Sequence, residues 1–256
     1  MSRFFMRFNL QNSVSSFPAT KDVFAPILPS MSEEEIKATL EDFERIRIER
    51  AQRVSAECKD AIEKIKGKSV LFLGDSITSD NLGYRLTVTK CASLKAYDCS
   101  VSGGLSSMLT YVTKDFTSKL KPDIVSLMVG TNDSIGMESI DNPQTSLEEF
   151  GRNIDLILKW VTKSGAKVVL FEIPPVHEQR FSNCFNPNSK FQNNENIKKF
   201  NAMLKKVANV YGVNVISNDC YLQNADENYE IDGAHLSVKA HEIHAKRWIQ
   251  ETAKLF

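Results

Sequence analysis

The sequence predicts an α/β protein in which helices cover both faces of a parallel sheet. Short apolar segments rich in branched residues alternate with longer helical ones, which is the pattern of strand–helix repeats. The strand-like segments are mostly apolar throughout, as expected of strands that are buried on both faces. The chain has 256 residues, 42% of them hydrophobic, so it is long enough to bury one sizeable core. We expect one such domain over residues 67–256.

Residues 1–66 are predicted to be an extension of this domain and not an independent domain. The first part, to about residue 30, carries Ser, Pro and Asn without a clear period, which indicates an irregular arm. Residues 32–66 predict one long helix, because Ser32 and Glu35 form a capping-box pattern and apolar residues then recur at helical steps. Such a helix packs either on its own domain or on a second copy of the chain, which would give a homo-oligomer.

The alternation begins directly after this helix. Strands are predicted at residues 69–74, 94–101, 123–130, 166–173 and 213–217. Helices are predicted at residues 105–119, 146–163, 191–211 and 237–255, with a less regular helical pattern at 79–91. Ligands of open α/β sheets bind at the carboxyl ends of the strands. The polar residues that follow each predicted strand are therefore the candidates for function.

Composition argues against several classes of function. The 32 basic and 32 acidic residues cancel, so there is no electrostatic reason to expect nucleic acid or an anionic membrane as partner. The five cysteines are scattered without a C-x-x-C pair, which is typical of reduced thiols. No apolar stretch reaches the length of a secretory signal core or a membrane span. We expect a cytoplasmic protein.

Ser76, in the stretch LFLGDSITSD, follows the first predicted strand. A serine hydroxyl is a poor nucleophile unless a base removes its proton, and a third group usually orients that base. Asp232 and His235 are three residues apart in IDGAH, with Gly233 between them to permit a tight turn. Such a turn brings the carboxylate against one imidazole nitrogen and leaves the other facing outward. Taken alone, this spacing also fits an aspartate that caps the following helix.

Donors for an oxyanion follow two other predicted strands. Asn132, in VGTNDS, can donate through its side-chain amide. Gly103 and Gly104, in SVSGGLSS, can donate a backbone N–H, and the missing Cβ lets a substrate approach closely. Each motif by itself fits an ordinary turn or cap equally well.

Together these motifs resemble the SGNH or GDSL hydrolases. The family's blocks are matched by GDSI at 74–77, GTND at 130–133 and DGAH at 232–235, and the resemblance covers about residues 68–255. The second block departs from the family pattern, which often has an Asn a few residues before the oxyanion glycine where this chain has DCSVSGG. Gly104 is the expected donor there, with Gly103 as the alternative.

The resemblance implies a three-layer α/β/α sandwich around a five-stranded parallel sheet, flavodoxin-like in topology. It also implies an esterase that works through an acyl-enzyme, with Ser76 as nucleophile, His235 as base and Asp232 as its acidic partner. The N–H groups of Ser76 and Gly104 and the side chain of Asn132 would hold the oxyanion. No cofactor is expected.

Rival chemistries are less well supported. There is no G-x-S-x-G elbow, P-loop or G-x-G-x-x-G motif. A metal site would draw on Asp232, His235, His241 and His244, but there is no H-E-x-x-H, and a half-exposed helix face explains the last two histidines more simply. No metal is therefore expected. A non-catalytic binding module would not need a nucleophile, base and oxyanion donor together, whereas transfer of the acyl group to an alcohol stays open.

The substrate is expected to be a small-molecule or glycan ester. The Asn-rich loop over residues 174–196 has the length of a binding element, so His177, Phe181 and Phe185 are candidates to line the pocket, as is Ile135 after GTND. A loop that packs its own aromatic residues is the alternative. The polarity of the loop favours short acyl groups, O-acetyl esters of carbohydrates first, over lipid, lysophospholipid or thioester substrates.

Overall fold

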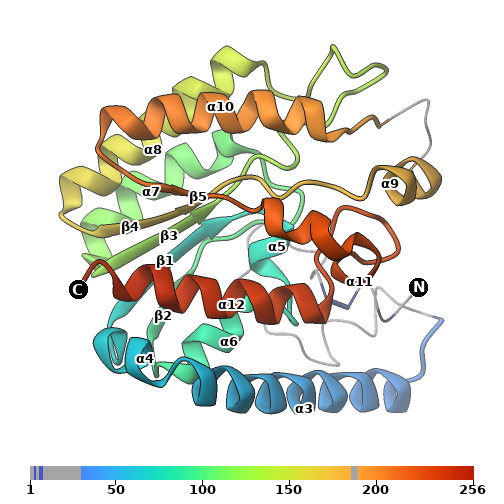
Figure 1. The fold of residues 1–256 in the computed structure, drawn as a ribbon, viewed down its shortest axis with the longest axis vertical. Helices are drawn as coiled ribbons and strands as arrows, with labels where there is room; N and C mark the ends of the chain where they lie inside the picture. The colour runs from blue at the N-terminus through green and yellow to red at the C-terminus, as the bar shows by residue number, and fades with distance from the viewer. Residues whose placement is uncertain (1–2, 4–5, 8–29, 186–189) are drawn as a thin grey trace.

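The computed structural model describes residues 3, 6–7, 30–185 and 190–256. Its sheet has the order β2-β1-β3-β4-β5, and every pair of neighbours is parallel (Figure 1). The strands are β1 Ser69–Gly74, β2 Lys95–Asp98, β3 Ile124–Met128, β4 Lys167–Phe171 and β5 Val215–Ile216. This is the strand order of flavodoxin-like folds, in which ligands bind where the order reverses. The five-stranded parallel sheet is confirmed.

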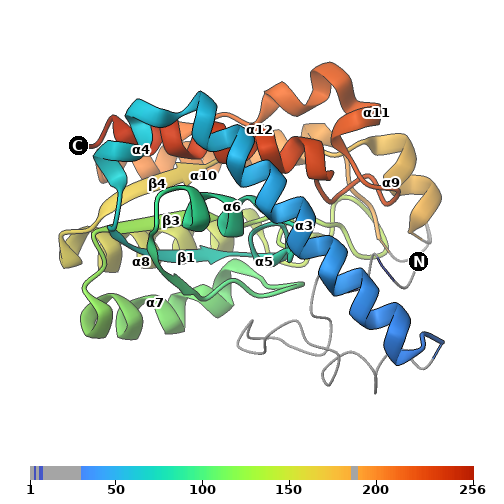
Figure 2. The same ribbon diagram turned by 90° about the horizontal axis from the view of Figure 1, so that it is seen from below.

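Helices cover the sheet on both faces, so the predicted three-layer sandwich is confirmed (Figures 1 and 2). One face packs against α7 Ser106–Leu120, α8 Leu147–Ser164 and α10 Asn194–Val210, and the other against α4 Lys59–Ile65, α6 Tyr84–Cys91 and α12 Val238–Ala253. Side chains of a strand point alternately to opposite faces. Accordingly Val70 and Phe72 of β1 join one apolar cluster, while Leu71 and Leu73 join the other.

The prediction of one long helix over residues 32–66 is wrong, because the structure has two helices there. The capping box is confirmed: the Ser32 side chain and the Glu35 side chain each accept a backbone N–H of the other residue. Helix α3, Glu33–Glu57, then ends at Cys58, and α4 continues in a different direction (Figure 2). The change of direction buries Ile62 and Ile65 of α4 in the apolar cluster under the sheet. Tertiary packing therefore decides where α3 ends.

Helix α3 packs on its own domain, which was one of the two predicted alternatives. The side chain of Arg50 is fully buried and donates to the Thr87 hydroxyl at 2.7 Å. It also donates to the carbonyl oxygens of Leu82 and Gly83, at 2.6 and 3.0 Å. These bonds fix α3 to the start of α6. The homo-oligomer stays a prediction.

The structure adds short helices that the sequence pattern did not predict. They are α5 Ser76–Ser79, α9 Glu178–Cys184, the 3₁₀ helix η1 Asp219–Asn224 and α11 Ala225–Asn228. Such short helices are too brief to show a helical period in the sequence. Helices α5, α9 and α11 lie toward the edge of the sheet where the strands end (Figure 1). In the part of the chain that the structure describes, no helix combines the length and apolar character needed to cross a membrane.

Candidate active site

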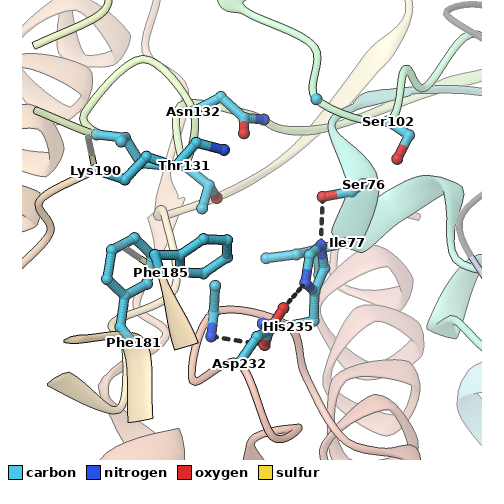
Figure 3. A pocket seen from close by; sticks show the side chains of 13 residues that line it. Ser76, Ile77, Ser102, Thr131, Asn132, Phe181, Phe185, Lys190, Asp232 and His235 are labelled. Carbon is cyan, nitrogen blue, oxygen red and sulfur yellow. Dashed lines mark hydrogen bonds and ion pairs between the residues drawn. The ribbon is translucent and has the colours of Figure 1, made fainter. Parts of the chain in front are cut away.

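Ser76 lies at the first position of α5, directly after β1. The carboxylate of Asp75 caps this short helix by accepting the Ile77 N–H at 3.1 Å. This cap holds the turn that places Ser76 at the carboxyl edge of the sheet. The Ser76 side chain is nearly buried, and its Oγ lies 2.8 Å from Nε2 of His235 (Figure 3).

Asp232 and His235 form the tight turn that their spacing predicted. One oxygen of the Asp232 carboxylate accepts the backbone N–H groups of Ala234 and His235, each at 3.0 Å, and the other lies 2.5 Å from His235 Nδ1. Gly233, between them, has φ +70°, and a Cβ at this position would lie 2.5 Å from the His177 carbonyl oxygen. Both the conformation and the close approach require glycine.

The environment of Asp232 keeps its carboxylate charged. Burial raises the pKa of Asp232, but the hydrogen bonds and positive charge of His235, with the N–H of Ala234, outweigh it and hold the pKa below its ordinary value. A charged Asp232 accepts the proton of His235 Nδ1, which leaves the Nε2 lone pair facing the Ser76 hydroxyl. His235, oriented by Asp232, can therefore take a proton from the Ser76 hydroxyl.

These residues open onto a cavity of about 330 Å³. It is lined by Ser76, Ile77, Ser102, Gly103, Thr131, Asn132, Ile135, Phe181, Phe185, Lys190, Asp232, Ala234 and His235 (Figure 3). The lining comes from the loops after β1, β2 and β3, from the region of α9 and from the turn before α12. The carboxyl edge of the sheet thus brings together residues that are far apart in the sequence.

Some of the residues predicted to contact the substrate line the cavity, and one does not. Ile135 and Phe181 line the cavity, whereas His177 does not. His177 lies at the N-terminus of α9, where its ring accepts the Arg180 N–H, and its Nε2 lies 3.0 Å from Asp226. Helix formation after β4 therefore directs this imidazole away from the cavity. Phe185, the other aromatic candidate of the loop, also lines the cavity and packs on Phe181 with ring centroids 4.6 Å apart.

The backbone N–H of Gly104 is already used within the protein. It donates to the Val101 carbonyl at 2.9 Å and closes a turn in which Gly103 has φ +73°. A positive φ at the third residue of such a turn is typical of type II. This bond counts against Gly104 and favours the alternative, Gly103, as the oxyanion donor, and the choice between them stays a prediction. Gly103, the alternative, lines the cavity, and its N–H has no acceptor among the described residues.

Gly104 contributes through its carbonyl group instead. The side-chain nitrogen of Asn132 donates to this oxygen at 3.0 Å. A side-chain amide carries two hydrogens on its nitrogen. Because one is bonded to Gly104, the amide is oriented, and the second can serve a ligand in the cavity that Asn132 lines.

Asp133 supports Asn132 from below the cavity, a role that the sequence did not reveal. Its carboxylate accepts the Ser106 N–H at 2.9 Å and the Ser106 hydroxyl at 2.5 Å, and Asn153 donates to that hydroxyl at 3.0 Å. These bonds connect the loop after β3 with the start of α7 and with α8. The network makes the loop that presents Asn132 rigid.

Asp75 is a second buried carboxyl group next to Ser76, and it yields a prediction on stability. Burial raises its pKa from 3.8 to about 6. The folded state therefore binds this proton up to a higher pH than the unfolded state, so the contribution to stability falls as the pH rises from about 4 to about 6, by about 3 kcal/mol in total. Asp75→Asn removes this titration. Urea unfolding should show wild type gaining about 2 kcal/mol relative to Asp75→Asn between pH 7 and 4, and the rest of the total below pH 4.

The matched control for that measurement is Asp115→Asn on α7. Asp115 is exposed and pairs with Lys119 on the same helix. Its unfolding free energy should follow the wild-type pH dependence. An equal pH dependence of wild type and Asp75→Asn would show that folding does not raise the pKa of Asp75.

His241 and His244 are fully buried. The expectation that they lie on a half-exposed helix face is therefore wrong. His244 Nδ1 bonds the Tyr221 hydroxyl at 2.6 Å, and His241 Nε2 lies 3.0 Å from Asp80. Burial lowers the pKa of His241 to about 4, so this imidazole is neutral near pH 7. Within the described ranges, no three His, Cys, Asp or Glu side chains are grouped to hold a metal ion.

Comparison with known proteins gives one family match. Residues 72–243 match the model of the GDSL-like lipase/acylhydrolase family. A multidomain esterase of Ruminococcus flavefaciens is 28% identical over 138 residues. That alignment covers 54% of this chain and 16% of the much longer relative.

Solved structures share the fold at low sequence identity. A lipase/acylhydrolase from Enterococcus faecalis superposes with a TM-score of 0.58 at 19% identity, covering 73% of this chain and 96% of that one. A carbohydrate acetylesterase from Sinorhizobium meliloti superposes with a TM-score of 0.56 at 19% identity, covering 74% of this chain and 100% of that one. An acetyl xylan esterase superposes with a TM-score of 0.55 at 21% identity, covering 70% of this chain and 98% of that one.

Proposed function

The chain belongs to the GDSL-like lipase/acylhydrolase family, and from this premise we propose that it is a serine esterase for short acyl esters. O-acetyl groups on carbohydrates are the first candidates. The observation that carries the proposal is the series of contacts from Asp232 through His235 to Ser76 at the wall of the cavity.

In the first half of the proposed reaction, Ser76 Oγ attacks the carbonyl carbon of the ester while His235 Nε2 takes its proton. The carbonyl oxygen becomes negatively charged, and the N–H groups of Ser76 and Gly103 and the side chain of Asn132 donate to it. His235 then gives the proton to the leaving alcohol, and the acyl group stays on Ser76.

In the second half, water replaces the alcohol. His235 removes a proton from the water, whose oxygen attacks the acyl carbon, and the same donors hold the oxyanion again. The tetrahedral intermediate collapses, His235 returns the proton to Ser76 Oγ, and the carboxylic acid leaves. Asp232 stays charged throughout and stabilises the imidazolium that forms in each half.

Two observations support a short acyl group. The cavity of about 330 Å³ lies at the lower end of the range of roughly 300–1,000 Å³ for small-molecule pockets. The paired rings of Phe181 and Phe185 take up one side of it. The acetyl-removing relatives of the same fold, one named for xylan and one for carbohydrates, support the choice of O-acetyl esters.

A series of aryl esters with increasing acyl length tests the proposal. We expect kcat/KM to be highest for the acetyl ester and at least about tenfold lower for the octanoyl ester, because each methylene that a pocket cannot hold costs about 1–3 kcal/mol. Acetate release from O-acetylated xylooligosaccharides should accompany the aryl acetate activity. Faster cleavage of the octanoyl ester would contradict the short-acyl assignment.

Phe185→Ala should enlarge the cavity and raise the ratio of hexanoyl to acetyl hydrolysis. Phe116→Ala is the matched control, since Phe116 is exposed on α7 and does not line the cavity.

Acyl-thioester and lysophospholipid substrates in the same assay show whether the enzyme prefers one of these acyl donors to acetyl esters. Product analysis with added alcohols separates hydrolysis from acyl transfer, since a transferase would form a new ester in place of the free acid.

A further inference from the structure

Arg7 lies outside residues 72–243, which match the family model, yet it is only 4% exposed. Its guanidinium is buried beside both chain segments that carry the proposed nucleophile and base. A buried charge is stable only where charged and hydrogen-bonding partners replace the water it has lost. The identity of those partners shows what Arg7 holds together.

On the side of Ser76, Arg7 binds the end of α5. Its Nε and Nη2 donate to the two carboxylate oxygens of Asp80 at 3.1 and 2.5 Å, a bidentate ion pair. Asp80 ends α5, and its N–H donates to the Ser76 carbonyl at 3.0 Å. The carboxylate is fully buried, and the charge of Arg7 and the bond from His241 hold the pKa of Asp80 below its ordinary value against the effect of burial. The pair thus stays charged near neutral pH.

The backbone of this N-terminal segment is held at the same place. The N–H of Asn81 donates to the Arg7 carbonyl at 2.7 Å, and the Asn81 side chain donates to the Met6 carbonyl at 2.8 Å. Main chain and side chain of the segment are therefore both bonded to the residues that follow α5.

On the side of His235, Arg7 binds both ends of the loop over residues 230–236. Its Nη2 donates to the Leu236 carbonyl at 3.0 Å, and its Nη1 pairs with the Glu230 carboxylate. Glu230 is itself tied to the base, because its N–H donates to the His235 carbonyl at 2.9 Å. Asp232 and His235 lie between these two points of attachment.

We propose that Arg7 is a positioning residue that joins the end of α5 to the loop over residues 230–236 and so keeps Ser76 Oγ within reach of His235 Nε2. This inference rests on the proposed function, since it assumes that proton transfer between these two side chains is part of the reaction. Arg7 does not line the cavity of about 330 Å³. Replacing Arg7 should therefore lower kcat and leave KM, which reflects substrate binding, unchanged.

Arg7→Met tests the proposal in the full chain. We expect kcat for an aryl acetate to fall by about 100-fold with KM unchanged, because a displacement of about 1 Å in a catalytic pair costs about that much. The rate constant of fluorophosphonate inactivation should fall in parallel. Arg7→Met also leaves the buried Asp80 carboxylate without its main partner, so the variant will be less stable as well.

The double variant Arg7→Met/Asp80→Asn separates the two effects. It removes both buried charges, which is often neutral for stability, and the asparagine can still accept the Leu82 N–H that Asp80 accepts at 2.7 Å. The connection between the loops remains broken. We expect the melting temperature to recover relative to Arg7→Met while kcat stays low. Arg7→Lys keeps the charge without the planar fork, so its kcat should lie between those of wild type and Arg7→Met.

Arg45→Met is the matched control, because Arg45 is exposed on α3 and pairs with Asp42 and Glu49 at the surface. It should behave as wild type. Wild-type kcat in folded Arg7→Met, or in the double variant, would overturn the proposal. A wild-type protein that hydrolyses no ester, or that a fluorophosphonate does not label at Ser76, would contradict the proposed function instead.

Discussion

Ser76→Ala is expected to lower kcat for aryl acetate hydrolysis by about 10⁶-fold, the loss typical of removing the nucleophile of a serine hydrolase. The methyl group leaves His235 Nε2 without the hydroxyl that lies 2.8 Å away. No acyl-enzyme can then form, and only the donors around the cavity remain to stabilise direct attack by water. The direct measurement is mass spectrometry of the intact chain after fluorophosphonate treatment, in which Ser76→Ala should show no added label.

Ser79→Ala is the control for this substitution. Ser79 is buried in the same short helix, but its hydroxyl donates to the Ser76 carbonyl and not to His235. Ser79→Ala should keep its labelling at Ser76 and most of its activity. Labelling of Ser76→Ala at another residue, with activity retained, would assign the nucleophile elsewhere.

Asp232→Asn is expected to lower kcat by about 10⁴-fold, the loss seen when the acidic member of such a triad becomes an amide. Asparagine keeps the oxygen that accepts the N–H groups of Ala234 and His235, so the turn can persist. Its nitrogen, however, would donate to His235 Nδ1. The imidazole proton would then be on Nε2, which could no longer accept the proton of Ser76.

The chain offers a matched aspartate–histidine pair for comparison. Asp226 lies 3.0 Å from His177 Nε2, and His177 does not line the cavity. Asp226→Asn should therefore leave kcat close to the wild-type value. Ester hydrolysis that survives Asp232→Asn within about tenfold, in a folded variant, would be incompatible with a tautomer fixed by Asp232.

Most of the regular elements could be predicted from local patterns. Strand β1 has the predicted bounds of residues 69–74, because a strand buried on both faces is a continuous apolar run. The main helices around the sheet were predicted from their period. Helices α5 and α9 were not, since one or two turns show no period, and the break of α3 at Cys58 depends on how α4 meets the core.

The site was predictable to the extent that its motifs are local. Asp232 and His235 meet within one turn of chain, so their spacing indicated the contact. Ser76 and His235 are 159 residues apart, and the sequence could bring them together only through the rule that strands of a parallel sheet end at one edge. The sequence left Gly103 and Gly104 open as donors, because the turn that the Gly104 N–H closes depends on backbone conformation and not on composition.

By itself the sequence determined the α/β class, the family and the loops that carry Ser76, Asn132 and the Asp232–His235 turn. The tertiary structure alone decided that Gly103 lines the cavity, that His241 and His244 are buried, and that Arg7 binds both Asp80 at the end of α5 and Leu236. Periods and turns arise from backbone geometry over a few residues, so they are visible in the sequence. Arg7 binds Asp80 and Leu236, which lie 73 and 229 residues away in the sequence, so such contacts form only when packing brings these segments together.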